Sequence, residues 1–368
     1  AGSRQTESRL GLDFGYEFDF WGKNRAAFAA ATSRAQAAGV DAFASRLLLS
    51  VAVARDYVQL GRACDQLEVT RATLAQRQKI DDLTRKRVAA GLGTRVELKQ
   101  AEAAIPTTRE ELAALDETAA LVRGQLAALL GAGPDRGLKI ACPKLAGMAG
   151  GTVLPSRLPA DLLGRRPDVV ASRWRVEAAA RDIDVAKAQF YPDIDLLGFI
   201  GFQSLGLSDF LQAGSGIAGI GPALHLPIFE GGRLRSQLAG ADADYDVAVG
   251  QYDQTLVDAL RDIGAQIISA RSVKEQGRQQ RLALDAASDA YDLALRRYRE
   301  GVDSYLSVLS AETQVLAQRR VGVDLRAREF ANEIELIRAL GGGFEAPSAP
   351  PGAQARSGSP STLPEYRP

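Results

Sequence analysis

The chain has 368 residues, of which 46% are hydrophobic and 24% charged, so it is long and apolar enough to fold as one large or two ordinary domains and is not a disordered chain. Its 45 basic residues balance its 45 acidic residues, and zero net charge argues against a nucleic-acid-binding protein, whose cations must neutralise phosphates. The two cysteines and one histidine show no spacing typical of zinc ligands, so we expect no metal site.

The chain begins with an alternating stretch. From Leu10 to Phe20, aliphatic and aromatic residues alternate with glycine and acidic residues. Neighbouring side chains of a β-strand point to opposite faces, so this alternation predicts one apolar face and one acidic face. The acidic face would carry Asp13, Glu17 and Asp19.

Stretches without proline predict very long helices. No proline occurs before Pro106 or between Pro227 and Pro347, whereas prolines are frequent in the middle of the chain. Because proline breaks helix interiors, these stretches are free to form long helices. A helix from Arg25 to Ala90 would be roughly 100 Å long, about three times the hydrocarbon thickness of a bilayer, which favours a coiled-coil wall or a spacer. No run of about 18 apolar residues occurs, so we expect no membrane-spanning helix.

The chain also contains an internal repeat. The segment GLGTRVELKQAE at 91–102 matches GVDSYLSVLSAE at 301–312, at an offset of 210 residues. Each copy is predicted to contain a strand, a long helix, a glycine-containing turn, a shorter helix and a glycine stop. The second copy begins near Leu158, so its counterpart in the first copy would precede residue 1. We therefore expect roughly fifty residues, including one strand, upstream of this sequence.

Two further strands are predicted in the second copy, at 190–203 and 217–229. The alternation places His225 on one face with Gly221 and Ala223, although Pro222 weakens the prediction because proline cannot donate to a ladder. A complete protomer would have four strands of about ten residues, the length that a tilted strand needs to cross a membrane. Four strands cannot close a barrel and lipid does not tolerate open sheet edges, so several protomers must pool their strands.

The remaining polar motifs favour structural roles. The motif GRRPD at 164–168 predicts a helix start, with Pro167 in the first turn, Asp168 at the positive helix end and the arginines paired locally. Cys64 and Cys142 are expected to be structural or incidental, because free cysteine often serves as a small buried hydrophobe. No catalytic constellation and no nucleotide-binding motif occurs, so we expect neither an enzyme nor a cofactor.

Four motifs, in order along the chain, resemble a known family. They are the segment from Leu158 to Leu196 (LPADLLGRRPD through FYPDIDL), GPALHLPIFEGGRLR, RRYREGVDSYLSVLSAE and ALGGG. Together they are similar to the outer membrane efflux factor family, the TolC-like group, in the branch of NodT-type and fusaric-acid-resistance efflux lipoproteins. The resemblance runs from about Leu10 to Gly343.

The resemblance implies a mainly helical homotrimer built from duplicated protomers. Long antiparallel coiled-coil helices would form an α-barrel in the periplasm, and four strands per complete protomer would form a shared barrel of twelve strands in outer membrane lipid. The strands would lie at 1–21 and 190–229, the α-barrel at 22–131, 158–189 and 230–341, the equatorial connection at 132–157, and a disordered tail at 345–368.

The resemblance also implies roles for individual residues. The tip turns that dock a periplasmic adaptor protein would be Gly91, Leu92, Gly93 and Thr94 in the first copy, and Gly301, Val302, Asp303 and Ser304 in the second. Leu306 and Ser310, one helical turn apart, match the positions that constrict the closed tip. Related members often carry aspartate where this chain has Ser310, which puts an acidic ring in doubt. The pore-lining strand residues would be Asp13, Glu17, Asp19 and His225.

The function implied by the resemblance is an outer membrane exit duct for small toxic compounds. An adaptor and an inner-membrane pump would open it and supply the energy. Two alternatives remain, namely a duct for secreted proteins and a soluble coiled-coil scaffold. The exposed aromatic face of the first strand argues against the scaffold.

Overall fold

The computed structural model describes residues 7–147, 164–205 and 213–344. The expectations for the tail at 345–368 and for the segment 148–163 lie outside the described residues. The chain divides into two compact units, which are described separately. Ala1–Ala42 with Asp168–Val257 form the sheet unit, and Phe43–Pro167 with Asp258–Pro368 form the hairpin unit.

The helices repeat as the sequence predicts. The long helices α1 (Lys23–Ala89) and α5 (Arg233–Arg299) each have 67 residues, and the shorter helices α2 (Arg95–Leu129) and α6 (Tyr305–Ala339) each have 35. Each helix of the second copy begins and ends 210 residues after its counterpart. The internal duplication is therefore confirmed. Pro106 lies within α2, so that helix continues through a proline.

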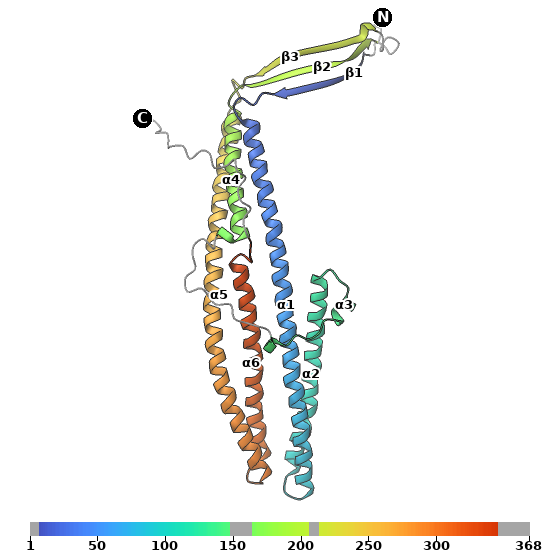
Figure 1. The fold of residues 1–368 in the computed structure, drawn as a ribbon, viewed down its shortest axis with the longest axis vertical. Helices are drawn as coiled ribbons and strands as arrows, with labels where there is room; N and C mark the ends of the chain where they lie inside the picture. Colours follow the sequence, from blue (N-terminus) through green and yellow to red (C-terminus); the bar gives the residue numbers. More distant parts are fainter. Residues whose placement is uncertain (1–6, 148–163, 206–212, 345–368) are drawn as a thin grey trace, which may run out of the picture. The chain divides into compact units, whose positions relative to one another are not determined.

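The sheet unit contains three antiparallel strands in the order β1-β2-β3 (Figure 1). They are β1 (Glu7–Glu17), β2 (Asp193–Leu205) and β3 (Gly216–His225). Asp13 pairs with Phe199, which pairs with Gly219, and residues directly opposite each other share a face. The register therefore places Asp13, Glu17 and His225 on one face, together with Arg9, Asp193 and Asp195. The other face carries Leu10, Leu12, Phe14, Tyr16, Ile200, Ile220 and Leu224, all of them exposed.

Aromatic side chains cover glycines across the sheet. A side chain on Gly219 would meet the Phe199 ring at 2.7 Å, and one on Gly198 would meet the Phe14 ring at 2.0 Å. Arg9 in turn lies over the Phe199 ring, with its guanidinium carbon 5.7 Å from the ring centroid. These contacts explain why an aromatic residue interrupts the polar face of β2. The proline in β3 is tolerated because β3 is an edge strand of the described sheet.

The first strand is shorter than expected, because β1 ends at Glu17. Asp19 lies beyond it and accepts hydrogen bonds from the backbone N–H groups of Asn24 and Arg25, at 3.1 and 2.9 Å. The prediction that Asp19 belongs to the acidic strand face is therefore wrong. Its carboxylate instead satisfies free N–H groups at the start of α1, where helices favour negative charge.

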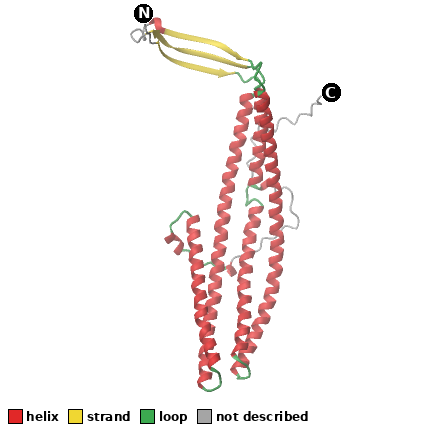
Figure 2. Ribbon diagram, turned by 180° about the vertical axis from the view of Figure 1, so that it is seen from behind, coloured by secondary structure: helices red, strands yellow, loops and turns green. Residues whose placement is uncertain are grey.

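The hairpin unit consists of two antiparallel helix pairs. In Figures 1 and 2, α2 runs back beside α1 and α6 runs back beside α5. One apolar cluster lies between α1 and α2, with Leu60, Leu67, Ala119 and Leu126 as members. A second cluster joins all four helices, and its buried members are Ile80, Ala101, Tyr291, Tyr298, Tyr305, Val308 and Val315. The two helix pairs therefore share a core near their turns.

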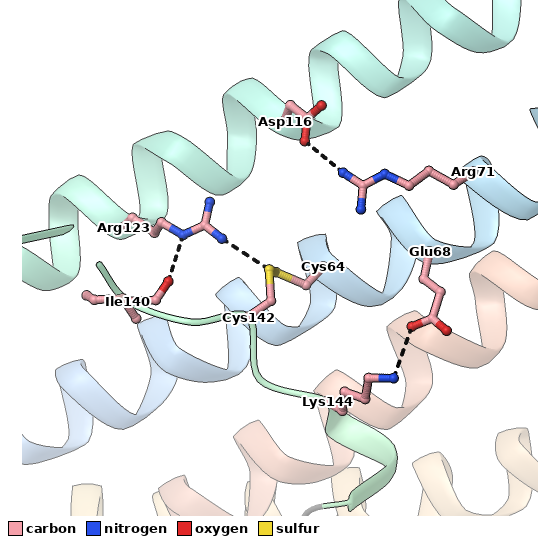
Figure 3. Close-up of a disulfide and its surroundings, with 8 residues drawn as sticks. All are labelled: Cys64, Glu68, Arg71, Asp116, Arg123, Ile140, Cys142 and Lys144. Atoms are coloured by element: carbon pink, nitrogen blue, oxygen red, sulfur yellow. Dashed lines mark hydrogen bonds and ion pairs between the residues drawn. A yellow bond between two sulfur atoms is a disulfide. The ribbon is translucent and has the colours of Figure 1, made fainter. Parts of the chain in front are cut away.

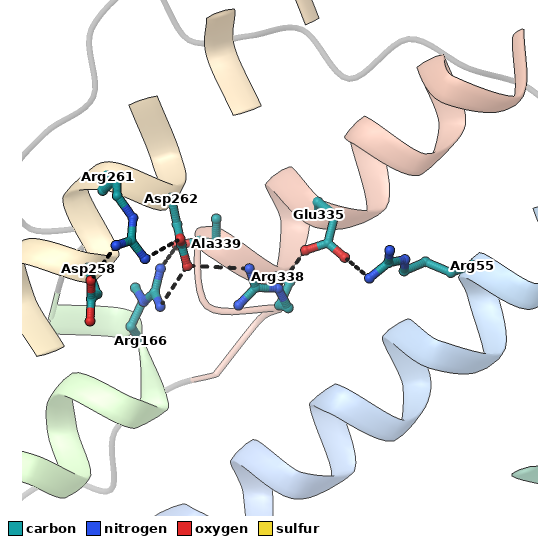
Figure 4. Close-up of polar contacts among 8 residues, drawn as sticks. All are labelled: Arg55, Arg166, Asp258, Arg261, Asp262, Glu335, Arg338 and Ala339. Carbon is teal, nitrogen blue, oxygen red and sulfur yellow. Dashed lines mark hydrogen bonds and ion pairs between the residues drawn. The ribbon is translucent and has the colours of Figure 1, made fainter. Parts of the chain in front are cut away.

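Helix α4 (Pro167–Ala188) begins at Pro167, and the carboxylate of Asp168 accepts the Val169 N–H at 2.9 Å, as predicted. Arg166 lies in the hairpin unit and is buried. Its guanidinium is 3.7 Å from Asp262 of α5 and donates to the carbonyl of Ala339, the last residue of α6 (Figure 4). Arg166 therefore contacts two elements that are distant from it in the sequence, which the expectation of local pairing did not include.

A disulfide joins Cys64 of α1 to Cys142, which follows α3 (Pro134–Leu138). The two cysteines lie 78 residues apart, and no spacing in the sequence predicts their pairing.

One helix among the described residues, α1, is long and apolar enough to cross a membrane by length and composition alone. The expectation of no membrane-spanning helix rested on the absence of a continuous apolar run, because polar residues interrupt the apolar ones along α1. A helix of this length and composition need not cross a membrane.

The sheet predicts a test of its closest backbone approach. A side chain at Gly201 would lie 2.3 Å from the carbonyl oxygen of Leu10 and 2.5 Å from Gly11, and backbone cannot yield as a side chain does. We expect Gly201→Ala to lower the free energy of unfolding by about 1–3 kcal/mol in urea titrations of the detergent-extracted protein. Gly221→Ala, with nothing within 4 Å, is the matched control and should cost less than about 0.5 kcal/mol. Equal losses would contradict the register.

Candidate functional site

The two turns that join the helix pairs share one backbone design. Gly91 and Gly301 adopt positive φ angles of 74° and 82°, which favour glycine. The N–H of Gly91 bonds to the carbonyl of Val88 and that of Leu92 to Arg87, and Gly301 and Val302 repeat the pattern. This pair of bonds is the Schellman motif that satisfies the last carbonyls of a helix. Both predicted turns therefore end their long helices in the same way.

The helices that follow the turns begin differently. In the first copy, Thr94 and Glu97 form a capping box, in which each side chain accepts the backbone N–H of the other residue, at 3.2 and 2.8 Å. In the second copy, Asp303 accepts the Ser304 N–H at 2.8 Å and the Ser307 hydroxyl at 2.7 Å. The hydrogen bond from Ser307 is the main cause that lowers the pKa of Asp303. Polar caps thus fix both turns.

Apolar side chains at the turns point into solvent. Leu92, Val96 and Val302 are 68%, 66% and 62% exposed. Exposed apolar groups that cluster on a surface mark interaction sites. Leu306 is 60% exposed and Ser310 is also exposed, on the face of α6 opposite to its buried residues. The two predicted gate residues therefore share one open face, as their spacing predicts.

Sequence reasoning missed a cluster that connects the two turns. Arg87 of α1 donates to the carbonyl of Tyr298 in α5 at 2.6 Å and to the carbonyl of Leu92 at 3.1 Å. Its guanidinium carbon lies 4.6 Å from the centroid of the Tyr298 ring. The Tyr298 hydroxyl is 3.0 Å from the hydroxyl of Thr84, and both residues are fully buried. We call Thr84, Arg87 and Tyr298 the tip clasp, because they tie one helix pair to the other.

A second contact supports the tip clasp. Glu97, already part of the capping box, also accepts the backbone N–H of Tyr305 at 3.4 Å. The backbone hydrogen bond from Thr94 is the main cause that lowers the pKa of Glu97. The carboxylate therefore stays ionised and links the start of α2 to the start of α6. One sequence signal could have found the clasp, since Arg87 and Tyr298 stand four and three residues before the two turn glycines.

A buried ion pair lies farther along the same helices. Arg77 of α1 donates to Glu312 of α6 at 3.1 Å, and to the Thr108 hydroxyl of α2 at 2.8 Å. The two charged side chains are only 14% and 4% exposed. Burial raises the pKa of Glu312, and the charge of Arg77 opposes that shift. This pair therefore joins three helices. Removing both charges from water costs free energy, which only the attraction between the two side chains offsets.

The predicted strand residues form a separate set in the sheet unit. Asp13 pairs with Arg9 at 2.9 Å, and Glu17 pairs with Lys23 at 2.9 Å. His225 is exposed at the end of β3, on the same face as both carboxylates. Within the described ranges, no group of three or more histidine, cysteine or acidic residues could hold a metal ion.

The buried ion pair predicts a large effect from one substitution. Glu312→Ala leaves Arg77 buried without its partner, so we expect a loss of about 3–5 kcal/mol in the free energy of unfolding. Glu329→Ala, at an exposed position of the same helix, should cost less than about 0.5 kcal/mol. Replacing both partners, with Arg77→Met and Glu312→Leu, should recover most of the loss. A loss in Glu312→Ala no greater than in the control would contradict the assignment.

The pair also predicts a pH dependence. A folded-state pKa raised above the ordinary 4.5 means that the folded protein binds the Glu312 proton more tightly than the unfolded chain does. The contribution of Glu312 to stability is therefore largest below pH 4.5 and declines as pH rises through the raised pKa. Urea titrations from pH 4 to pH 8 should show this decline in the parent protein and a flatter profile in Glu312→Gln. Identical profiles would contradict the shift.

Comparisons with known proteins agree with the geometry. The sequence profile of the family described as outer membrane efflux protein matches residues 1–132 and 158–342. The chain is 39% identical to the fusaric acid resistance protein FusA of Burkholderia cepacia, over 94% of this chain and 66% of FusA. It is 31% identical to the multidrug resistance outer membrane protein MdtP of Escherichia coli, over 94% of this chain and 70% of MdtP.

A solved structure shows the same fold. The crystal structure of the outer membrane protein VceC from Vibrio cholerae is 42% identical and superposes with a TM-score of 0.84, covering 92% of this chain and 80% of VceC. The chain spans about two thirds of the length of FusA, so it corresponds to part of that relative. With its duplicated helix pairs, paired turns and antiparallel strands, the chain belongs to the outer membrane efflux protein family.

Proposed function

We propose that the protein is the outer membrane exit duct of a tripartite efflux pump for small toxic compounds. The observation that carries the proposal is the pair of turns, which expose apolar side chains while buried contacts tie the two helix pairs together. The exposed apolar side chains would form a docking surface. The buried contacts beside it would have to rearrange before compounds could pass. The names of the relatives FusA and MdtP, which refer to fusaric acid and multidrug resistance, support the substrate class.

The proposed assembly is a homotrimer. The described sheet leaves β1 and β3 as edges, and a lipid environment requires that edge backbone groups be paired. If a protomer supplies four strands, three protomers would supply the twelve strands of a closed barrel. The polar face with Asp13, Glu17 and His225 would then line the pore, and the aromatic face would meet lipid. The helix pairs would extend into the periplasm as a helical barrel.

The proposed gate is the inner face of α6 near its start. Leu306 would narrow the closed passage, and Ser310 would supply a neutral ring rather than an acidic one. In this proposal the conformation that the tip clasp holds would be the closed one. Opening would break the contacts of Arg87, because they join the pair α1 and α2 to the pair α5 and α6.

The proposed partners are a periplasmic adaptor and an inner-membrane pump. The turns at Gly91–Thr94 and Gly301–Ser304 would meet the adaptor, with the exposed Leu92 and Val302 side chains as apolar anchors. Energy must reach the duct from these partners, because no nucleotide-binding motif occurs in the sequence.

A complementation experiment tests the function. The full-length gene, expressed with its adaptor and pump in a bacterial host deleted for its own duct, should raise the minimal inhibitory concentrations of several amphipathic toxic compounds at least fourfold. The double variant Leu92→Asp with Val302→Asp should lose this protection, because charges at the anchors oppose docking. Leu138→Asp, at an exposed leucine of α3, is the matched control. No protection by the parent protein would contradict the proposal.

The gate predicts a change in channel conductance. Arg87→Gln removes a cation–π contact and charge-assisted hydrogen bonds worth about 2–3 kcal/mol together. In planar bilayers we expect the variant to spend roughly tenfold to hundredfold more time open. Arg85→Gln is the control, because Arg85 lies two residues away, is exposed, and pairs with Asp81 of α1 and Glu102 of α2 rather than with α5. Equal behaviour of the two variants would contradict a clasp at Arg87.

A further inference from the structure

The segment after α3 crosses α1 as a strap, which we define as residues 139–147. At one end, Ile140 packs against the apolar cluster of α1 and α2. At the other, Leu145 is 1% exposed and packs with Val58 of α1 and Ala327 of α6. Gly61 permits this close approach, since a side chain there would meet Leu145 at 2.6 Å. The disulfide joins the middle of the strap to α1 (Figure 3).

The two sulfur atoms of the disulfide lie in different environments. Cys64 is 8% exposed and belongs to the apolar cluster with Leu60 and Leu67. Cys142 is exposed. Arg123 of α2 donates to the Cys142 sulfur at 3.1 Å, and the same guanidinium donates to the carbonyl of Ile140 at 3.0 Å, which fixes its position (Figure 3). Cys142 therefore has both solvent access and a hydrogen bond from a cation, whereas Cys64 is buried among apolar side chains.

We propose that Cys142 is the reactive cysteine of this pair, which receives a disulfide from an external donor and passes it to Cys64. The thiolate is the attacking species in thiol–disulfide exchange, and a neighbouring cation increases the thiolate fraction. Access matters equally, and the strap presents Cys142 at the surface. Cys64, enclosed by apolar side chains, is the resolving cysteine.

The chemistry consists of two exchanges. The Cys142 thiolate attacks one sulfur of the donor disulfide, forms a mixed disulfide and expels the other donor sulfur as a thiolate. Cys64 then loses its proton to solvent, and its thiolate attacks the Cys142 sulfur and expels the remaining donor thiolate. Two protein thiols are oxidised to one disulfide, and the donor disulfide is reduced to two thiols. The partner is thus a disulfide donor, either a small molecule or a dithiol oxidoreductase.

The order of events couples oxidation to folding. Cys64 can reach Cys142 only when the strap lies across α1, with Leu145 seated between α1 and α6. The second exchange can therefore occur only after the strap has packed against α1. Cys142 lies between the two stretches that match the family profile, whereas Cys64 lies within the first. The inference does not depend on the proposed transport function.

The test compares two single variants with oxidised glutathione as the donor. In the reduced, detergent-extracted Cys64→Ser variant, Cys142 should form a glutathione adduct, measured by intact mass, at least tenfold faster than Cys64 does in Cys142→Ser. Circular dichroism confirms that both variants are folded, and in urea the two rates should converge. Equal rates in the folded state, or a faster reaction of Cys64, would overturn the proposal.

A second measurement isolates the role of Arg123. In Cys64→Ser, the pH dependence of alkylation should give a Cys142 thiol pKa below the ordinary value of about 8.5. Adding Arg123→Gln should return the pKa to that value, whereas Arg123→Lys should keep most of the shift. Arg71→Gln is the matched control, because Arg71 pairs with Asp116 and makes no contact with the sulfur (Figure 3). A pKa unchanged by Arg123→Gln would overturn the assignment of Arg123.

A third experiment identifies the disulfide donor from the adduct that it leaves on Cys142 in cells. Cys64→Ser cannot complete the second exchange, so protein isolated under acid quench should retain its donor on Cys142. A small mass increase would identify a low-molecular-weight disulfide, and a reducible protein adduct on a gel would identify an oxidoreductase. An unmodified Cys142 thiol in cells, with adducts on Cys64 in the Cys142→Ser variant, would contradict the proposed order.

Discussion

The unpaired edges of the three-stranded sheet are the constraint on which the rest of the account depends. β1 and β3 are each bonded on one side within the described chain, and the face that carries Leu12 and Ile220 leaves these side chains 78% and 72% exposed. An apolar face with open backbone edges is stable in lipid only when other strands complete the ladder. The proposed sharing of strands between copies answers this requirement, and the polar face with Asp13 and His225 is the side proposed to line the pore.

The hairpin unit meets a different requirement of the proposed duct, which is to hold long helices in place and still allow the proposed gate to open. Helix α6 is fixed near its start by Glu97 and by the core around Tyr305, and at its end by Arg166, which binds the carbonyl of Ala339 (Figure 4). Between these points, the buried pair of Arg77 and Glu312 joins α6 to α1 and α2. Polar contacts suit both requirements, because they are directional and a residue can exchange one partner for another. Continuous apolar packing would instead hold the helices together along their whole contact surface.

Much of this structure could be predicted from the sequence, because its signals are local and repeated. Proline-free stretches predicted α1 and α5, and the repeat predicted equal helices 210 residues apart. The turns at Gly91 and Gly301 could also be recognised in the sequence, because a backbone position with a positive φ favours glycine. Most of the missed features depend on pairing between distant segments. Asp19 is a local exception, since it reads as one more alternating carboxylate but caps the helix that begins a few residues later. The disulfide of Cys142 has no signal within its own stretch, and the positions of Arg87 and Tyr298 before the turn glycines do not by themselves show that the two residues touch. The pKa of Glu312 likewise depends on burial that only the packed helices create.

The number of chains in the assembly shows whether strands are shared between copies. Full-length protein should be extracted from outer membranes with detergent and its mass measured by native mass spectrometry. The account predicts a complex of three copies that requires detergent, since the open sheet edges of one chain must be closed by others. A monomer or dimer that stays in solution without detergent would contradict it, because the aromatic strand face and both sheet edges would then tolerate water unaided.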